Sequence, residues 1–249
     1  MTIESAKDLE SLRIIGRIVA QTIKLMQQSI ESGMTTKELD DIGRKYLEHH
    51  GARSAPELVY NFPGATCISI NEAVAHGIPG EKIIKDGDMV NIDVSAELNG
   101  YFADSGASFI VPPSNDLKKE LLRATKQALN KAIDEVRAGM PINIIGKTIE
   151  KHARKTGYTV IRDLGSHGVG RALHEEPKFI APYYDKNDRR ILKEGMVITI
   201  EPFLSTGAES ITQDKDGWTL KTDNKFLSAQ FEHTMVITKN KPILITVCN

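Results

Sequence analysis

The chain has 249 residues, of which 40% are hydrophobic and 26% are charged, with a formal net charge of −1 at pH 7. These values are typical of a globular protein, and the balanced charge gives no overall attraction to nucleic acid or to an anionic membrane. The two cysteines, Cys67 and Cys248, are too far apart for a zinc knuckle and argue against a disulfide framework, so we expect a reducing, cytoplasmic environment. No run approaches the roughly 20 apolar residues of a membrane span, and residues 1–20 lack a signal-peptide core.

The first half of the chain predicts two helices followed by strands. Apolar residues recur at helical spacing through residues 4–32, and Gly33 supplies a helix stop. The segment 35–51 starts with capping threonines and ends in glycine, as a second helix would. Strand-like runs follow at 66–70, 89–98 and 100–111.

The same order of elements then returns in the second half. Residues 114–138 and 141–156 predict two further helices. Strand-like runs follow at 196–204, 226–240 and 242–247.

The two halves also share glycine positions. Gly33-Met34 and Gly51 recur at one constant offset as Gly139-Met140 and Gly157. We interpret this as a duplication within a single catalytic domain, residues 1–249, with halves of about 1–112 and 113–249. A chance match between two Gly-Met pairs is the alternative.

Four acids lie inside strand-like apolar runs: Asp93, Asp104, Glu201 and Glu232. An ionised carboxylate among apolar neighbours is unfavourable unless a cation or strong hydrogen-bond donors compensate it. For any one of them, a solvent-facing position on a strand is the simpler explanation. Four together indicate a shared site.

The hairpin signal Asn99-Gly100 relates the first two acids in space. If these are the two turn residues, Ser95 faces Asp104 across the hairpin. Asp93 then lies two residues from Ser95 on the same face, so the two acids are diagonal neighbours within reach of a common ion. A bulge in either strand would break this register.

The stretch LGSHGVGRALHEEP, residues 164–177, places His167 and His174 among glycines. It could be a glycine-rich loop or part of a catalytic or metal site. Four carboxylates and one imidazole would form a hard, oxygen-rich site suited to divalent Mn, Fe, Co or Zn. Five ligands exceed the needs of one catalytic metal, so they favour two metals that share carboxylates.

Six motifs occur in order along the chain: NEAVAHGIPG around His76, NIDV, GYFAD, SHGVGRALHEEP, TIEP and QFEHT. Together they resemble the bacterial type I methionine aminopeptidases, members of the wider group with the pita-bread fold. The resemblance runs from the first helix to residue 240. It implies an α+β fold in which two pseudo-symmetric halves surround a curved, mainly antiparallel sheet with helices on its outer face.

The resemblance implies a set of metal ligands, namely Asp93, Asp104, His167, Glu201 and Glu232. Asp104 and Glu232 would bridge two divalent ions of Co, Mn, Fe or Zn. The family also has a monovalent-cation site, which would fall near Asn71, Ala73 and Ser228.

In the family mechanism, a hydroxide held between the metals attacks the peptide bond. The resemblance then makes Glu201 the proton shuttle. His174 would stabilise the oxyanion or the scissile carbonyl group, and His76 would contact the scissile amide nitrogen or the following residue.

The resemblance also implies an apolar pocket for the methionine side chain. Its expected lining residues are Phe62, Cys67, Trp218 and Val59. Val59 stands where many members of the family have a tyrosine.

The resemblance implies an enzyme that removes the initiator methionine from nascent proteins and peptides with a small second residue. We expect a monomer whose partners are nascent polypeptide N-termini, with transient ribosome contact, no specific nucleic-acid binding and no membrane association. One alternative is a prolidase-like or Xaa-Pro aminopeptidase, although those usually carry an extra N-terminal domain. Another is a non-catalytic member that binds ribosomes or RNA, although such members typically lose metal ligands.

Overall fold

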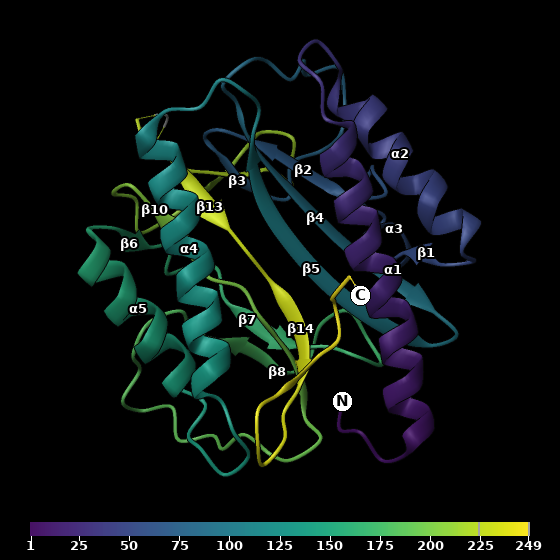
Figure 1. Cartoon of the computed structure of the whole chain (residues 1–249), viewed down its shortest axis with the longest axis vertical. Coiled ribbons are helices and arrows are strands. Elements are labelled where there is room, and N and C mark those ends of the chain that lie inside the picture. The colour runs from purple at the N-terminus through teal and green to yellow at the C-terminus, as the bar shows by residue number, and fades with distance from the viewer. Residues whose placement is uncertain (224, 249) are drawn as a thin grey trace.

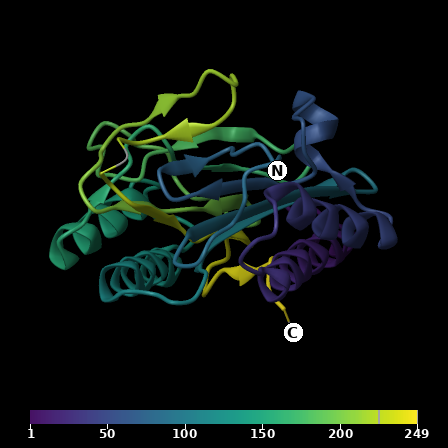
Figure 2. The ribbon, with the colours of Figure 1, turned by 90° about the horizontal axis from the view of Figure 1, so that it is seen from above.

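The computed structural model describes residues 1–223 and 225–248 of the chain, and its four long helices lie on one face of a layer of strands (Figure 1). Figure 2 shows the helices together on the lower side of this layer, with the short helix α3 (Ala55–Tyr60) on the opposite side. The long helices are α1 (Ala6–Ser29), α2 (Thr36–His49), α4 (Asp116–Glu135) and α5 (Ile144–Thr156). The predicted mixture of helices and mainly antiparallel strands is therefore confirmed.

The strands fall into two larger and two smaller sheets. The first sheet contains β1 (Arg53–Ser54), β2 (Cys67–Ile70), β4 (Met89–Leu98) and β5 (Tyr101–Ile110). Its strand order is β1-β4-β2, and β5 also pairs with β4. The second has the order β15-β14-β9-β7-β8; its strands are β7 (Ser166–Gly168), β8 (Glu175–Ile180), β9 (Val197–Ile200), β14 (His233–Val236) and β15 (Ile243–Leu244).

The two smaller sheets lie at the margins of the larger ones. One has the order β13-β10-β6, with β6 (Thr159–Val160), β10 (Phe203–Ser205) and β13 (Ser228–Gln230). The other has the order β11-β12-β3, with β3 (Ala73–Ala75), β11 (Thr212–Gln213) and β12 (Leu220–Lys221).

The two N-terminal helices begin where local sequence supplies a cap. Ser5 and Asp8 form a reciprocal capping box at α1, and Thr35 and Glu38 form another at α2. Each box satisfies amide groups that have no partner inside the helix. This capping fixes the start of both helices close to the predicted positions.

The β4–β5 hairpin has the predicted register. Leu98 pairs with Tyr101 and Ser95 pairs with Asp104. Both turn residues, Asn99 and Gly100, have the positive φ values, 53° and 80°, that a two-residue turn of this kind requires. The expected diagonal placement of Asp93 and Asp104 on one strand face is therefore confirmed.

The prediction of continuous strands at 196–204 and 226–240 is wrong. The first run breaks between β9 and β10 at Glu201-Pro202, and the second breaks between β13 and β14 at residues 231–232. Proline has no amide hydrogen for the ladder, so pairing stops at Pro202. At the second break, the amide of Glu232 donates instead to the carbonyl of Gly106 in β5, at 2.8 Å.

Apolar side chains form two large clusters, one under each pair of long helices. Helices α1 and α2 pack with β4 and β5, and this cluster includes Leu12, Ile15 and Ile92. Helices α4 and α5 pack with β9 and β14, around residues such as Leu121 and Ile198. That the halves arose by duplication stays a prediction.

His152, near the C-terminal end of α5, is buried rather than on the helix surface. Its ring is buried against α4, where Nε2 lies 3.1 Å from the carbonyl oxygen of Ala124 and Nδ1 lies 2.8 Å from Nζ of Lys131. The ring therefore packs the two helices of the second half together.

None of the helices within residues 1–223 and 225–248 is both long enough and apolar enough to cross a membrane.

Two helical glycines allow a test of how α1 packs. A methyl group on Gly16 would lie 2.5 Å from the backbone carbonyl oxygen of Ile245, whereas one on Gly43 of α2 would meet the flexible side chain of Met26 at 2.6 Å. We expect Gly16→Ala to lower the free energy of unfolding by about 1–3 kcal/mol, because backbone cannot move aside easily.

The matched variant Gly43→Ala should change stability by less than about 1 kcal/mol, since the gain in helix propensity offsets the displacement of Met26. Urea denaturation of both variants measures the difference. Equal losses would show that the backbone contact at Ile245 does not constrain α1.

Candidate active site

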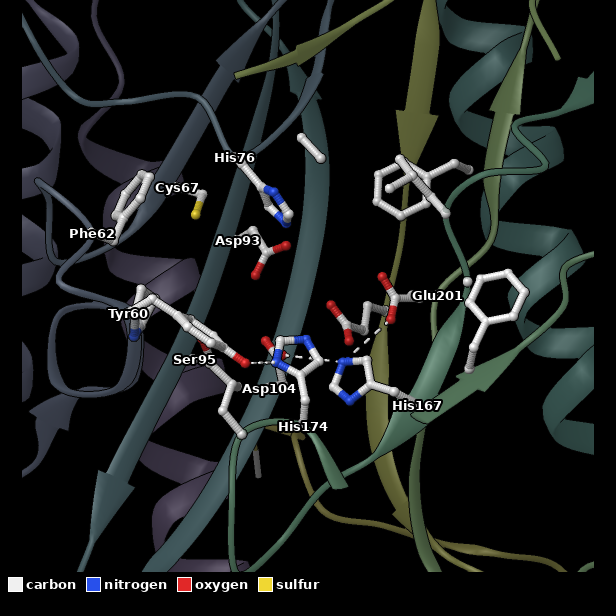
Figure 3. Close-up of a pocket in the computed structure, with 18 of the residues that line it drawn as sticks. Tyr60, Phe62, Cys67, His76, Asp93, Ser95, Asp104, His167, His174 and Glu201 are labelled. Atoms are coloured by element: carbon white, nitrogen blue, oxygen red, sulfur yellow. Dashed lines mark hydrogen bonds and ion pairs between the residues drawn. The ribbon is translucent and has the colours of Figure 1, made fainter. Parts of the chain in front are cut away.

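A cavity of about 390 Å³ opens between the inner faces of the two large sheets (Figure 3). Its lining comes from both halves of the chain, and it includes every predicted metal ligand. These ligands are Asp93, Asp104, His167, Glu201 and Glu232. The two sets of strands thus bring together residues that are far apart in sequence.

Asp104, His167 and Glu232 form the centre of this cluster. Each offers one oxygen or nitrogen atom, and these atoms all lie within 4.8 Å of one another. The three residues are only 7%, 5% and 3% exposed. Nε2 of His167 lies 3.6 Å from Oδ2 of Asp104 and 3.5 Å from Oε1 of Glu201, as the dashed lines in Figure 3 show.

Backbone and hydroxyl contacts join Asp104 to Glu232 across the break between β13 and β14. The Thr234 hydroxyl accepts from the amide of Asp104 and donates to its carbonyl oxygen, at 3.0 and 2.7 Å. The Ser105 hydroxyl donates to the carbonyl oxygen of Glu232 at 2.7 Å. The interrupted ladder therefore frees Glu232 from strand pairing and holds it against β5.

A second set of contacts positions His167 and Glu201 on neighbouring strands. The Thr199 hydroxyl accepts from the amide of His167 and donates to Oε1 of Glu201, each at 3.1 Å. The amide of Glu201 donates to the hydroxyl of Ser166 at 3.1 Å. Since Pro202 ends β9, the Glu201 side chain is presented at the end of the strand, directed into the cavity.

Burial and mutual repulsion disfavour negative charge on three of the carboxyl groups. Burial, followed by the neighbouring Asp104, raises the pKa of Asp93 and of Glu232 well above the ordinary values. Burial also raises the pKa of Glu201 to about 7. Burial opposes the charged form of His167, but the adjacent carboxylates of Asp104 and Glu201 outweigh it and raise its pKa to about 9.

The cluster also contains buried oxygen atoms without a partner. Oδ1 of Asp104 and Oε1 of Glu232 have no hydrogen-bond partner within residues 1–223 and 225–248. Nδ1 of His167 lies 3.0 Å from the carbonyl oxygen of Gly168, which can only accept, so Nδ1 carries hydrogen and Nε2 faces the acids. Unpaired carboxylate oxygens opposite an oriented imidazole are the donor set that a divalent cation requires.

Gln230 fixes the orientation of two carboxylates and was not recognised from the sequence. Its Nε2 donates to Glu232 at 3.1 Å and to Asp93 at 3.4 Å, while its Oε1 accepts from Asn91 at 2.7 Å. Gly106 leaves the space that this side chain occupies. The sequence does carry one signal for Gln230. It lies two residues before Glu232, and residues two apart in a predicted strand are expected on the same face.

The loop that carries His174 is clamped to the first half by Arg171. Nη2 of Arg171 donates to Asp8 at 2.7 Å and to the Tyr101 hydroxyl at 2.8 Å, and its guanidinium lies over the Tyr101 ring. The pKa of Asp8 is lowered to about 2, chiefly by hydrogen bonds from Tyr101 and Ser5. The clamp therefore retains its charge over the whole neutral range.

His174 lies at the mouth of the cavity, with its ring centroid 4.2 Å from that of His167. Partial burial, together with the neighbouring His167, lowers its pKa to about 4, so the ring is neutral at pH 7. The hydroxyl of Tyr60 lies 2.7 Å from its Nδ1. Tyr60 was not recognised from the sequence as a site residue.

His76 reaches the cavity from the end of β3, where its side chain points toward Asp93 in Figure 3. Its φ of 53° lies in the left-handed region, which is uncommon for residues other than glycine. Such backbone conformations persist where the surrounding structure holds them and are frequent at functional sites. Burial lowers the pKa of His76.

Three of the four expected pocket residues line the cavity and one does not. Phe62 and Trp218 meet edge to face with ring centroids 5.2 Å apart, and Cys67 lies beside them with a thiol whose pKa is raised by burial. Val59 is outside the lining and 42% exposed, so the structure does not place it in the pocket. Its neighbour Tyr60 takes that side of the cavity, because α3 ends at Tyr60 and the preceding residue faces outward.

Comparison with known proteins agrees with this geometry. The model of metallopeptidase family M24 matches residues 10–239. A methionine aminopeptidase 2 of Bacillus subtilis is 48% identical to this chain, over 99% of both sequences. The crystal structure of a methionine aminopeptidase from Rickettsia prowazekii superposes with a TM-score of 0.94 at 38% sequence identity. That match covers 99% of this chain and 100% of the other. A prolidase from Pyrococcus furiosus has a TM-score of 0.80 at 24% identity, and this chain covers 66% of it.

The expected pita-bread fold is confirmed by these structural neighbours. The chain belongs to metallopeptidase family M24.

Proposed function

We propose that this metallopeptidase is an aminopeptidase that removes the N-terminal methionine from nascent proteins and peptides with a small second residue. One observation carries the proposal: an apolar wall and a cluster of five ionisable side chains line a single cavity. The full-length similarity to methionine aminopeptidases supports it.

Divalent ions would be held by Asp93, Asp104, His167, Glu201 and Glu232. The unpaired oxygens of Asp104 and Glu232, together with the oriented Nε2 of His167, support this assignment. Five ligands favour two ions, of Co, Mn, Fe or Zn. When bound, such ions polarise the scissile carbonyl group and lower the pKa of water.

Three side chains that line the cavity would act on the peptide. Glu201 follows β9 with its side chain directed into the cavity, where its carboxylate would accept and return a proton. His174 is neutral and lies at the cavity mouth, where an N–H group can donate to the oxygen of the scissile carbonyl group. His76, which reaches the cavity from the end of β3, would contact the scissile amide nitrogen or the residue that follows it.

Phe62, Cys67 and Trp218 would hold the methionine side chain. An unbranched thioether fits an irregular apolar pocket, and its sulfur makes favourable contacts with aromatic ring edges. The edge-to-face pair of Phe62 and Trp218 supplies both a ring face and a ring edge on this wall. The acids at the other end of the cavity would then face the free amino group and the scissile bond.

The monovalent-cation site near Asn71, Ala73 and Ser228 stays a prediction. Asn71 has a left-handed φ of 57°, and Ser228 has a buried hydroxyl without a partner in the described part of the chain. Both features support a bound ion beside β3. A monomeric state, ribosome contact and a cytoplasmic location are likewise predictions.

The activity can be tested with purified protein and the tripeptide Met-Ala-Ser. We expect chelator-sensitive release of methionine with Mn, Fe or Co, and far less hydrolysis of Xaa-Pro peptides, which would indicate the prolidase-like alternative. Asp104→Asn and Glu232→Gln should lower kcat/KM by roughly a thousandfold or more while the far-ultraviolet circular dichroism stays unchanged. Absence of methionine release with all three metals would refute the proposal.

The metal assignment predicts a coupled release of protons. Without metal, His167 has a pKa of about 9 and is protonated at pH 7, while Glu201 has a pKa of about 7 and is protonated in about half of the molecules, so a divalent ion must displace protons from both. We expect Mn²⁺ binding to release protons at pH 7 and its affinity to fall as the pH falls from 8 to 6. Calorimetry in two buffers of different ionisation enthalpy measures this. Binding without proton release would contradict the assignment.

A further inference from the structure

The Tyr60–His174 hydrogen bond joins the two halves of the chain across the mouth of the cavity. Tyr60 is the last residue of α3, and its hydroxyl oxygen lies 2.7 Å from Nδ1 of His174. The two rings are 5.7 Å apart between centroids and inclined at 48°. Figure 3 shows the Tyr60 side chain reaching toward His174 beside the carboxylate cluster.

Local sequence directs Tyr60 into the cavity. Ser54 caps the start of α3, and the helix ends at Asn61, whose φ of 56° turns the chain sharply. Arg44 of α2 makes a bidentate ion pair with Glu57, at 2.9 and 2.6 Å, which fixes the short helix from outside. The tyrosine therefore reaches the cavity from a constrained element, although it is 43% exposed.

The backbone near His174 is held firmly, but the ring itself is not. Arg171 is clamped to Asp8, and the amide of Phe102 donates to the carbonyl oxygen of Gly170 at 2.8 Å. Within residues 1–223 and 225–248, Tyr60 is the only hydrogen-bond partner of the His174 ring. The hydroxyl of Tyr60 thus controls the orientation of the ring about its side-chain bonds.

The protonation states of Tyr60 and His174 determine which of them donates the hydrogen bond between them. Burial and the neighbouring Asp104 raise the pKa of Tyr60, so its hydroxyl retains its proton. In a neutral imidazole one nitrogen carries hydrogen and the other accepts. The two nitrogens point to different sides of the ring, so with Nδ1 accepting from Tyr60 the ring hydrogen lies on Nε2, which faces the cavity.

We propose that Tyr60 is a positioning residue: its hydroxyl donates to Nδ1 of His174, places the ring hydrogen on Nε2, and holds that N–H group toward the scissile carbonyl oxygen. The orientation of this N–H group toward a scissile carbonyl oxygen rests on the proposed aminopeptidase function. With the opposite tautomer, a nitrogen lone pair would face the carbonyl oxygen, and no stabilisation of developing negative charge would result.

The test uses Tyr60→Phe, which removes only the hydroxyl, and Tyr60→Leu, which also removes the ring. Tyr184→Phe is the matched control, because Tyr184 is 48% exposed, lies outside the cavity and contacts Lys147. Nitrogen NMR of ¹⁵N-histidine-labelled protein, loaded with diamagnetic Zn²⁺ and also metal-free, reports which nitrogen of His174 carries hydrogen. Steady-state kinetics on Met-Ala-Ser follows kcat and KM separately.

We expect hydrogen on Nε2 of His174 in the parent protein, a changed Nδ1 signal in Tyr60→Phe, and no change in Tyr184→Phe. Tyr60→Phe should lower kcat by roughly tenfold, the effect of one hydrogen bond, with KM changed less than about twofold. Tyr60→Leu should lower kcat at least as much.

Four results would overturn the inference: hydrogen on Nδ1 in the parent protein, an unchanged His174 signal in Tyr60→Phe, a normal kcat in Tyr60→Phe with loss only in Tyr60→Leu, or a rise in KM at constant kcat. The last two would indicate ring packing and direct substrate binding, respectively. If the parent protein releases no methionine, the proposed function fails, while the NMR signals still decide whether Tyr60 donates to His174.

Discussion

Mutual repulsion among four carboxyl groups in one buried cavity is the interaction on which the architecture of the site depends. Asp93, Asp104, Glu201 and Glu232 converge from both halves; burial, followed by repulsion from neighbouring carboxylates, raises the pKa of Asp93 and of Glu232, and burial raises that of Glu201. One histidine and the amide of Gln230 offset only part of this charge. A site so arranged is complete only when cations bind.

The surrounding fold holds these groups where their own repulsion would separate them. A regular hairpin fixes Asp93 and Asp104, whereas Glu201 and Glu232 lie at breaks in the ladder. Hydroxyl groups bond the backbone at these breaks: Ser166 accepts from the amide of Glu201, and Ser105 donates to the carbonyl oxygen of Glu232. The regular β4–β5 hairpin therefore positions Asp93 and Asp104, and the two strand breaks position Glu201 and Glu232. At the cavity mouth, the Arg171 clamp holds the loop that carries His174, and the Tyr60 hydroxyl lies 2.7 Å from Nδ1 of its ring.

Features encoded by neighbouring residues could be predicted from the sequence. The Asn99-Gly100 turn determines the hairpin register, and capping residues determine where α1 and α2 start. The ligand set and its histidine loop followed from motif order. Features that depend on tertiary contacts could not be predicted. Pro202 in the sequence could have indicated the strand break at Glu201, whereas the break at Glu232 depends on a hydrogen bond from its amide to the carbonyl of Gly106. Tyr60, and not the predicted Val59, lines the cavity, because α3 ends at Tyr60 and the chain then turns at the left-handed residue Asn61. The spacing of apolar residues in the sequence does not reveal this turn.

The central claim is that the buried acids form a cation site, and anomalous X-ray diffraction from crystals grown with Mn²⁺ tests it most directly. The account predicts the strongest anomalous peaks inside the cavity, in contact with Oδ1 of Asp104 and Oε1 of Glu232, the two oxygens without a protein partner in the described part of the chain. Cluster carboxylates that remain free of metal at saturating Mn²⁺, or peaks only elsewhere on the protein, would contradict it.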